Sequence, residues 1–391
     1  MAIGTPATTL VDAARELRPR ILAQREQIEA GRRLPEDLTR ELARAGFFRA
    51  TLPAAYGGLD VNPLEMLELV EELARADASV AWCVWNGNVN WTTARLPAET
   101  AQAVYADPET ILANNTRPSG QAVVVEGGYR LSGRWSLVSG CQLSTWLILL
   151  STVYEDGEPR RTPAGATELR FMLFPTANAE VVDTWTVGGL RGTGSHDVVL
   201  QDVFVPAAFA SFYSDPLILT EPRYRCLPIA RVRPGLGAMA LGIARGAIES
   251  LVNLAVEKRL MGARDTVRHD WAAQTQLAQA EGLVRSARLY LFDTLGRVWD
   301  EVLASGEASV EARAQGALAA WHAVTSAARA VDLVYQTGGA TSLYATCPIE
   351  RAFRDVHAIT QHLGVHPRTL EPVGQVLYGL EPEAAPGVPS F

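Results

Sequence analysis

The sequence predicts an α+β protein of three domains: an amino-terminal helical domain (1–109), a central β-barrel or sandwich (110–225) and a carboxy-terminal four-helix bundle (226–391). Three observations predict this class. The 391 residues exceed a single domain of roughly 150 residues, and 48% of them are hydrophobic, enough for a large core. The spacing of apolar residues is helical in the first hundred residues, alternates in the middle of the chain, and is helical again after Pro234.

The first domain is expected to consist of helices. Apolar residues recur at three- and four-residue spacing over 11–29, 36–45 and 63–76. Asp77-Ala78-Ser79 forms a helix cap, and the segment 80–96 that follows it is apolar on every face. Such a helix is expected to be buried on all sides.

Three asparagines, Asn86, Asn88 and Asn90, interrupt this apolar segment. Buried amides need hydrogen-bond partners, and leaving one unpaired costs about 1–3 kcal/mol. Their presence favours a cavity beside the helix. The alternative is that one or two of them bond neighbouring backbone.

The middle of the chain is expected to form short strands. Two alternating runs within 122–135 are joined by Gly127-Gly128, which is a hairpin signal. Further strands are expected at 146–153, 169–175, 179–184 and 197–205. Short strands separated by Gly and Pro are typical of a barrel or a sandwich.

Long helices are expected after Pro234. They cover 236–259, 270–305, 309–337 and 348–362, which is the make-up of a four-helix bundle. Gly235, Gly237 and Gly242 lie in or beside the first of them. No strand precedes these glycines, so we expect them to allow close helix packing and not to bind a dinucleotide.

Composition excludes several classes of function. A net charge of -8 and a pI near 5.4 leave no basic surface for nucleic acid. Continuous apolar runs fall short of the roughly 20 residues of a membrane span, and the first thirty residues lack a signal peptide, so we expect a cytoplasmic protein with no membrane partner. Four cysteines without a CxxC pair argue against a metal site.

The glycine-rich string 189–195 is a first candidate for chemistry. It contains Arg191, Thr193 and Ser195 between expected strands, where its backbone N–H groups could face an anion or a flavin. The alternative is an ordinary hairpin loop.

Three histidines near the end of the last expected helix, His357, His362 and His366, are a second candidate. No HExxH or ExxH accompanies them, so acid–base or hydrogen-bond chemistry is favoured over a metal. For His366, beside Pro367, a helix-terminal role is the alternative.

Several strings occur in an order that is typical of one family. They are LPAAYGG (52–58), PSGQA (118–122), GGYRLSGRWSLVSG (127–140), WTVGGLRGTGS (185–195), Gly338-Gly339 and Arg354-Asp355 with the His362 region. Together they resemble the acyl-CoA dehydrogenase superfamily. Within it, the chain is similar to the two-component flavin-dependent monooxygenases typified by the oxygenase of p-hydroxyphenylacetate hydroxylase and by dibenzothiophene monooxygenase.

The resemblance implies a homotetramer in which a flavin lies between the β-domain and the bundle. It implies a set of cofactor-binding residues from one subunit, joined by others from across the subunit boundary. The first group is Asn115, Thr116, Trp135, Ser136, Ser139, Arg191, Thr193 and Ser195; the second is Arg259, Gly338, Gly339 and Ser342.

The resemblance also implies a reaction class. Dehydrogenases of the superfamily carry a catalytic Glu where this chain has His362-Leu363-Gly364. His362 therefore resembles the monooxygenase residue that acts as acid or base beside the flavin, and Ser139 is expected to donate near N5. Asn88 is expected to make the second polar contact to substrate. The remaining pocket residues are expected to be Trp85, Trp91, Phe209 and His366.

These observations predict an enzyme that oxygenates a small aromatic or electron-rich substrate with O₂ through a flavin C4a-hydroperoxide. Reduced FMN, with FAD possible, would arrive from a separate NAD(P)H:flavin reductase, because the chain has no Rossmann fingerprint. Two alternatives remain. One is an acyl-CoA dehydrogenase-type oxidoreductase, and the other is a non-catalytic flavin- or ligand-binding protein on the same fold.

Overall fold

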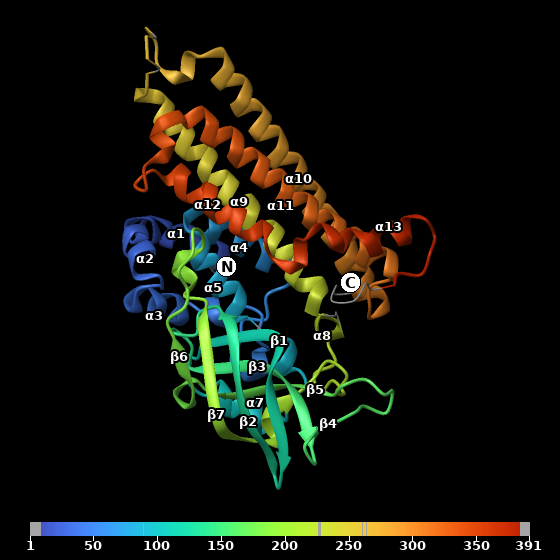
Figure 1. The fold of residues 1–391 in the computed structure, drawn as a ribbon. Coiled ribbons are helices and arrows are strands. Elements are labelled where there is room, and N and C mark those ends of the chain that lie inside the picture. The colour runs from blue at the N-terminus through green and yellow to red at the C-terminus, as the bar shows by residue number, and fades with distance from the viewer. Residues whose placement is uncertain (1–8, 89, 226–227, 260, 263, 384–391) are drawn as a thin grey trace, which may run out of the picture.

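The computed structural model describes residues 9–88, 90–225, 228–259, 261–262 and 264–383. Figure 1 shows three layers along the molecule: a sheet at one end, long helices at the other, and the amino-terminal helices between and beside them. The chain thus has the predicted order of helices, strands and helices.

The amino-terminal helices differ from the expected ones in their ends. The helices are α1 (Leu10–Ala23), α2 (Arg25–Gly31), α3 (Glu36–Arg44), α4 (Pro63–Ala76), α5 (Ala78–Gly87), α6 (Asn90–Thr93) and α7 (Ala98–Val104). The single helix expected over 11–29 is two helices that meet at Gln24. The apolar helix expected over 80–96 ends at Gly87, since the Asn88 side-chain amide donates to the Val84 carbonyl at 2.7 Å and closes α5.

The strands form one mixed sheet where the sequence predicts a barrel or a sandwich. They are β1 (Leu112–Val125), β2 (Gly128–Val138), β3 (Trp146–Glu155), β4 (Glu158–Pro159), β5 (Leu169–Pro175), β6 (Glu180–Val182), β7 (His196–Pro206) and β8 (Ala210–Ser211), in the order β6-β7-β2-β1-β3-β5-β8, with β4 beside β3. The expected hairpin joins β1 and β2, and Gly127 at its turn has a φ of 78°. β1 and β3 are parallel, and their register shifts between Asn115 and Gly120.

The carboxy-terminal half is helical, as predicted. Its helices are α8 (Pro222–Arg225), α9 (Pro228–Glu257), α10 (Trp271–Ser305), α11 (Val310–Gly338), α12 (Pro348–Thr360) and α13 (Glu371–Leu377). The glycines of α9 allow close packing, as expected: a Cβ on Gly242 would lie 2.2 Å from the Glu71 carbonyl oxygen of α4. Two short 3₁₀ helices, η8 (Leu363–Val365) and η9 (Pro367–Leu370), separate α12 from α13.

Part of α9, Arg233–Glu257, is long and apolar enough to cross a membrane by length and composition, although its continuous apolar runs are shorter than a membrane span. In the structure 56% of its most apolar stretch is buried. It packs between α4 and α11 (Figure 1), as the core helix of a helical domain does.

Candidate functional site

Three buried hydroxyl groups form a continuous chain where the loop after β2 meets the loop before β7. Ser139 Oγ lies 2.7 Å from Ser195 Oγ, which lies 2.7 Å from Thr193 Oγ1. Thr193 Oγ1 donates to the Leu190 carbonyl oxygen at 2.8 Å. These three hydroxyls are called the hydroxyl relay below. Sequence reasoning named all three residues, and the structure brings them together.

Helix α5 supplies the neighbours of Ser139. The Trp82 indole N–H donates to Ser139 Oγ at 2.9 Å, and the Asn86 amide donates to the Ser139 carbonyl oxygen at 2.9 Å. The Asn114 amide of β1 in turn donates to Asn86 Oδ1 at 2.9 Å. Asp77 caps the start of this helix by accepting from Ser79 N at 2.9 Å. Sequence reasoning missed Trp82, although its four-residue spacing from Asn86 places both on one helix face.

The His362 ring also contacts Trp82. Their ring centroids are 5.8 Å apart in an edge-on arrangement. The Gly364 backbone N–H donates to His362 Nδ1 at 3.0 Å, so the neutral ring carries its proton on Nε2. Burial, together with the charge of Arg117, lowers the pKa of His362 to about 4. At neutral pH the ring is therefore uncharged and offers an N–H donor.

His366 and His357 are placed differently from His362. Helix α12 ends at Thr360, so His362 and His366 do not share a helix face; each begins a separate 3₁₀ helix. His366 is exposed, and its Nδ1 accepts from Arg368 N at 3.2 Å. His357 pairs with Asp332 of α11 at 2.9 Å.

The β-strand candidates separate into buried and exposed groups. Trp135 is fully buried under Gly120, and its indole donates to the Leu150 carbonyl oxygen at 2.7 Å. Trp135 is thus part of the core of the β-domain, and its expected contact with a flavin stays a prediction. Asn115 donates to the Ser136 carbonyl oxygen at 2.7 Å and accepts from a backbone N–H at 2.8 Å. Thr116 and Ser136 are exposed beside it.

Leu137 is a candidate that sequence reasoning missed. It lies between Ser136 and Ser139, has a φ of 63° and is 44% exposed. A left-handed backbone is costly for a residue with a Cβ and is uncommon outside glycine. This conformation leaves an apolar side chain exposed to solvent two residues before Ser139.

Asn88 makes its polar contacts inside the protein. Its amide nitrogen donates to the Phe47 and Val84 carbonyl oxygens, and its oxygen accepts from Thr51 N at 3.1 Å. Both polar atoms of Asn88 thus have partners within the protein, and its expected contact with substrate stays a prediction. Asn88 therefore matches the alternative expected for the asparagines, in which the amide bonds nearby backbone.

Two of the expected aromatic wall residues pack against different parts of the fold. Trp85 packs on α9, where a Cβ on Gly235 would lie 2.3 Å from the indole. Phe209 instead stacks on Trp146 of the β-domain, with ring centroids 5.8 Å apart. The side chain of Trp91 lies outside the described residues.

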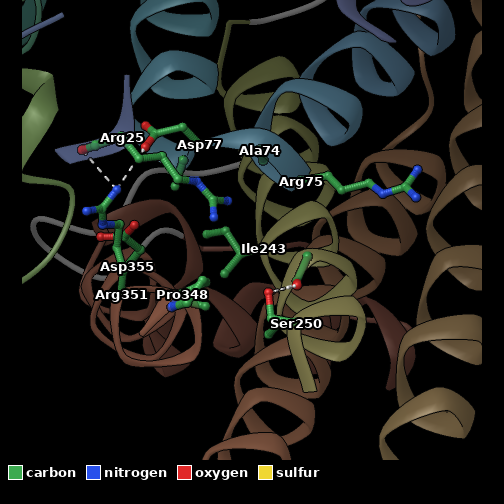
Figure 2. Close-up of a pocket in the computed structure, with 13 residues that line it drawn as sticks. Arg25, Ala74, Arg75, Asp77, Ile243, Ser250, Pro348, Arg351 and Asp355 are labelled. Atoms are coloured by element: carbon green, nitrogen blue, oxygen red, sulfur yellow. Dashed lines mark hydrogen bonds and ion pairs between the residues drawn. The ribbon is translucent and has the colours of Figure 1, made fainter. Parts of the chain in front are cut away.

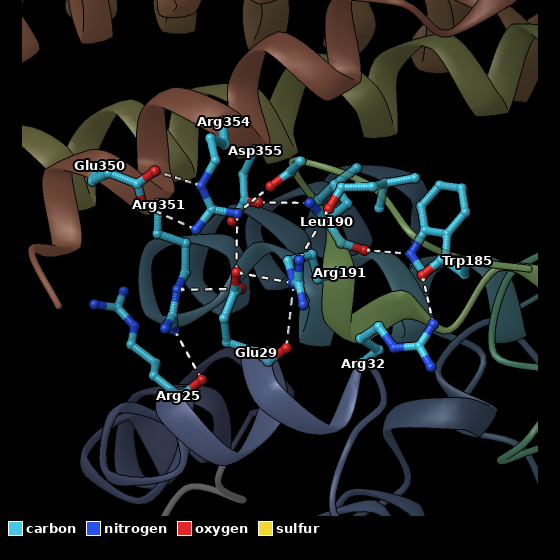
Figure 3. A network of polar contacts seen from close by, with 12 residues as sticks. Arg25, Glu29, Arg32, Trp185, Leu190, Arg191, Glu350, Arg351, Arg354 and Asp355 are labelled. Atoms are coloured by element: carbon cyan, nitrogen blue, oxygen red, sulfur yellow. Dashed lines mark hydrogen bonds and ion pairs between the residues drawn. The ribbon is translucent and has the colours of Figure 1, made fainter. Parts of the chain in front are cut away.

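The glycine-rich loop is held by an ionic network, and Figure 3 shows it between α2, α12 and the loop. Arg191 pairs with Glu29 at 3.2 Å, and the same carboxylate pairs with Arg354 at 2.9 Å. Arg191 is thus engaged in holding the loop. The Leu190 backbone N–H donates to Asp355 Oδ1 at 2.6 Å.

Two buried carboxylates lie in this network. Asp77 and Asp355, with Arg25 and Arg351, line a cavity of about 20 Å³ (Figure 2). That volume has room for about one water molecule and none for an organic ligand. Burial, and next the neighbouring Asp77, raises the pKa of Asp355 to about 7.

The residues expected from across the subunit boundary lie at the far end of α9. Lys258, the only lysine of the chain, donates to the Gly338 carbonyl oxygen and to Thr341 Oγ1 at 2.6 Å. Ser342 is fully buried against Gly338.

Near them, Arg259 donates to the Arg264 carbonyl oxygen at 2.5 Å, and Gly339 has a φ of 53°. Leu236, which lies against Gly364 at the other end of α9, is 22 residues from Lys258, or roughly 33 Å at 1.5 Å per residue. Within one chain, the residues near Lys258 and the residues near Gly364 are therefore too far apart to hold the same ring system.

Known proteins resemble the chain along almost its whole length. The family models "Acyl-CoA dehydrogenase, N-terminal domain" and "Acyl-CoA dehydrogenase, C-terminal domain" match residues 7–105 and 235–367. The flavin-dependent monooxygenase oxygenase subunit HsaA of Mycobacterium tuberculosis is 31% identical over 392 residues, covering 96% of this chain and 97% of that protein. An indole-3-acetate monooxygenase of Acinetobacter baumannii is 29% identical, covering 90% and 89%.

Two further matches name the cofactor. An FADH(2)-dependent resorcinol hydroxylase oxygenase component of Rhizobium is 28% identical, covering 91% of each chain. The crystal structure of XiaF from Streptomyces in complex with FADH2 and glycerol superposes with a TM-score of 0.88 at 26% identity, covering 98% of this chain and 97% of that one.

The fold and these matches together define a flavin-dependent oxidoreductase. The chain belongs to the acyl-CoA dehydrogenase superfamily, in its branch of flavin-dependent monooxygenase oxygenase components. It is the reduced-flavin-dependent oxygenase of a two-component monooxygenase, which implies a separate flavin reductase.

Proposed function

We propose that this enzyme hydroxylates a small aromatic substrate with O₂ and a reduced flavin that binds over Ser139. The observation that carries the proposal is the Ser139–Trp82–His362 cluster, which joins the β-domain to the end of the bundle. The site fits such a cofactor, because Ser139 Oγ keeps a lone pair for a ligand donor and exposed Leu137 lies beside it. Bound reduced flavin would supply the two electrons that activate O₂.

The cofactor and its partners follow from the relatives. Two relatives are named with FADH2, so we propose reduced FAD as the natural cofactor and reduced FMN as the alternative. An NAD(P)H:flavin reductase would deliver it in the cytoplasm. A neighbouring subunit of a homotetramer would complete the site with Arg259, Gly338, Gly339 and Ser342. Within one chain these residues lie near Lys258, roughly 33 Å along α9 from Leu236, which contacts Gly364.

In this proposal His362 acts through its Nε2–H. With a pKa near 4 the ring is neutral at pH 7, and Gly364 N occupies Nδ1. His362 can therefore donate a hydrogen bond to an oxygen atom of the reacting pair, and it does not act as a cationic acid. Trp82 contacts both His362 and Ser139, through its ring and its indole N–H.

The test is the His362→Asn variant, with indole-3-acetate and resorcinol as probe substrates. We expect reduced-flavin affinity close to wild type, a loss of hydroxylation on the order of 10²-fold, and hydrogen peroxide in place of the missing product. Product is measured by chromatography and peroxide by a coupled assay.

His366→Asn is the matched control, because His366 is exposed and contacts Arg368. Loss of hydroxylation in His366→Asn and not in His362→Asn would keep the reaction and move its histidine. No effect of either variant would contradict a histidine-based mechanism.

The two alternative functions are tested with the same protein. An acyl-CoA dehydrogenase would reduce an electron acceptor with an acyl-CoA substrate, and the resemblance implies that the His362 string stands where such enzymes carry their catalytic Glu. A non-catalytic flavin carrier would bind reduced flavin and yield no hydroxylated product with any probe.

A further inference from the structure

Strand β1, in the middle of the sheet, contains a bulge. Its register with β3 shifts between Asn115 and Gly120, so that residues 116–119 stand opposite Leu150 alone. All the residues of the bulge are exposed. Bulges are common next to active sites, where they redirect a side chain.

Hydrogen bonds fix the shape of this bulge. The Asn115 side chain accepts from Arg117 N at 2.8 Å and donates to the Ser136 carbonyl oxygen at 2.7 Å. The Trp135 indole donates at 2.7 Å to the carbonyl oxygen of Leu150, which stands opposite the bulge. The backbone of the bulge is therefore held without help from the side chains that it exposes.

Arg117 is the charged residue of the bulge, whose sequence is Thr-Arg-Pro-Ser over 116–119. Within the part of the chain that the structure describes, its guanidinium has no hydrogen bond and no ion pair. By contrast, Arg191 and Arg354 at the glycine-rich loop are both paired with Glu29. Arg117 thus keeps all its side-chain donors for a ligand.

The charge of Arg117 acts on His362. After burial, it is the second cause of the low pKa of His362, and of the described charged groups it alone shifts that pKa. A like charge disfavours protonation of a neighbour when the two groups lie close together. The bulge therefore brings an unpaired cation near the imidazole, whose Nδ1 is occupied by Gly364 N.

Apolar side chains are exposed beside both groups. Leu137, next to Ser136, is 44% exposed, and Leu363, next to His362, is 51% exposed. Apolar surface suits an aromatic ring, and an arginine without a carboxylate partner suits an anion. The surroundings of His362 thus match a molecule that carries both.

We propose that Arg117 determines the substrate class of this enzyme by binding the carboxylate of a small aromatic acid. The inference rests on the proposed function, in which an aromatic substrate reacts beside His362. A guanidinium binds a carboxylate through two parallel N–H donors, which fixes the direction of the ligand as well as its position. A neutral aromatic substrate lacks this contact.

The cofactor is the other source of an oxyanion at this site. The phosphate of a flavin is separated from the ring system by the ribityl chain, whereas Arg117 lies near the residue proposed to act at the reacting atoms. This position favours the substrate as the partner of Arg117. The experiment separates the two sources by measuring both ligands.

The experiment is a calorimetric titration of wild type and Arg117→Gln, each loaded anaerobically with reduced FAD. Indole-3-acetate is compared with indole, and p-hydroxyphenylacetate with p-cresol, because each pair shares a ring and differs in the carboxylate. Wild type should bind each acid about 10-fold more tightly than its neutral partner, as expected for a hydrogen bond between charged groups. Arg117→Gln should bind the acids about 10-fold more weakly and the neutral probes equally well.

Arg130→Gln is the matched control. It removes the same charge from β2 of the same sheet, where the Arg130 side chain pairs with Asp202 at 3.5 Å. It should keep the wild-type preference for the acids. An equal loss of preference in both variants would be an effect of net charge and would overturn the inference.

The remaining outcomes separate the substrate from the cofactor and from the proposed function. Weaker binding of reduced FAD by Arg117→Gln, with an unchanged ratio of acid to neutral probe, would assign Arg117 to the cofactor and overturn the inference. Equal wild-type affinities within each pair would also overturn it. Hydroxylation of resorcinol without binding of either acid overturns the inference alone, whereas a protein that hydroxylates no probe overturns the proposed function as well.

Discussion

Ser139 and Asn88 were both predicted to contact the reacting molecules. The two side chains differ in their hydrogen-bond partners within the fold. Asn88 uses its amide to close α5 and to bind the backbone near Phe47. Ser139 has a serine and an indole as partners and keeps a lone pair free. The sequence indicates that polar groups occur in an apolar setting. It cannot indicate which of them the fold leaves unsatisfied, because the partners come from segments 37 to 57 residues away.

At the scale of single residues, the Asp355→Asn variant is expected to change how the stability of the protein depends on pH. In the folded protein the pKa of Asp355 is about 7, against roughly 3.9 in an unfolded chain. The folded state therefore binds more protons between these values, and this residue lowers the stability of wild type as pH rises from about 4 to 7. Asparagine keeps an oxygen for Leu190 N and does not titrate. Its stability relative to wild type should rise over that window and stay level above pH 7.

Urea unfolding of both proteins at pH 5 and pH 8 measures this difference. The variant is expected to gain on wild type at pH 8 relative to pH 5. The same stability gap at both pH values would contradict the assignment of a high pKa to Asp355.

At the scale of elements, periodicity predicted helices better than their ends. The segment 63–76 is α4 residue for residue, because Asn62 caps it and Asp77 ends it. The helix predicted over 80–96 was too long. The apolar periodicity continues past Asn88, but the Asn88 side chain ends the helix. The contact between α12 and the glycine-rich loop joins residues 165 positions apart, and no local pattern contains it.

This contact gives the prediction at the scale of elements. A Cβ on Gly189 would lie 2.2 Å from the Arg354 carbonyl oxygen, so Gly189→Ala must push the loop away from α12. We expect a loss of stability of about 1–3 kcal/mol and weaker binding of reduced flavin, because Leu190 and the relay move with the loop.

Gly188→Ala is the control from the next position, where a Cβ would meet no atom within 4 Å. Thermal unfolding and anaerobic flavin titration measure both variants. Equal, small effects of the two alanines would contradict a close contact between the loop and α12.

At the scale of the whole molecule, the described surface carries apolar side chains that a monomer would leave in water. Met261, Trp271, Leu343 and Tyr344 are each at least two thirds exposed. They lie near the end of α9, where Lys258 joins that helix to Thr341. Exposed apolar patches of this kind mark interaction surfaces. Their position beside Gly338 and Ser342 favours an interface that brings these residues to the Ser139 end of another subunit.

The last prediction is that assembly and flavin binding are lost together. Light scattering of wild type should give about four times the 42.2 kDa chain mass. The double variant Trp271→Glu with Tyr344→Glu places charges in the interface and should dissociate it. Reduced-flavin binding should weaken with it, although the Lys258 end of α9 lies roughly 33 Å along that helix from Leu236, which contacts Gly364 next to His362 in the same chain. Val123→Glu, an exposed apolar residue of β1, is the control and should leave both properties unchanged. A monodisperse wild-type monomer, or a dissociated variant with full flavin affinity, would contradict a site shared between subunits.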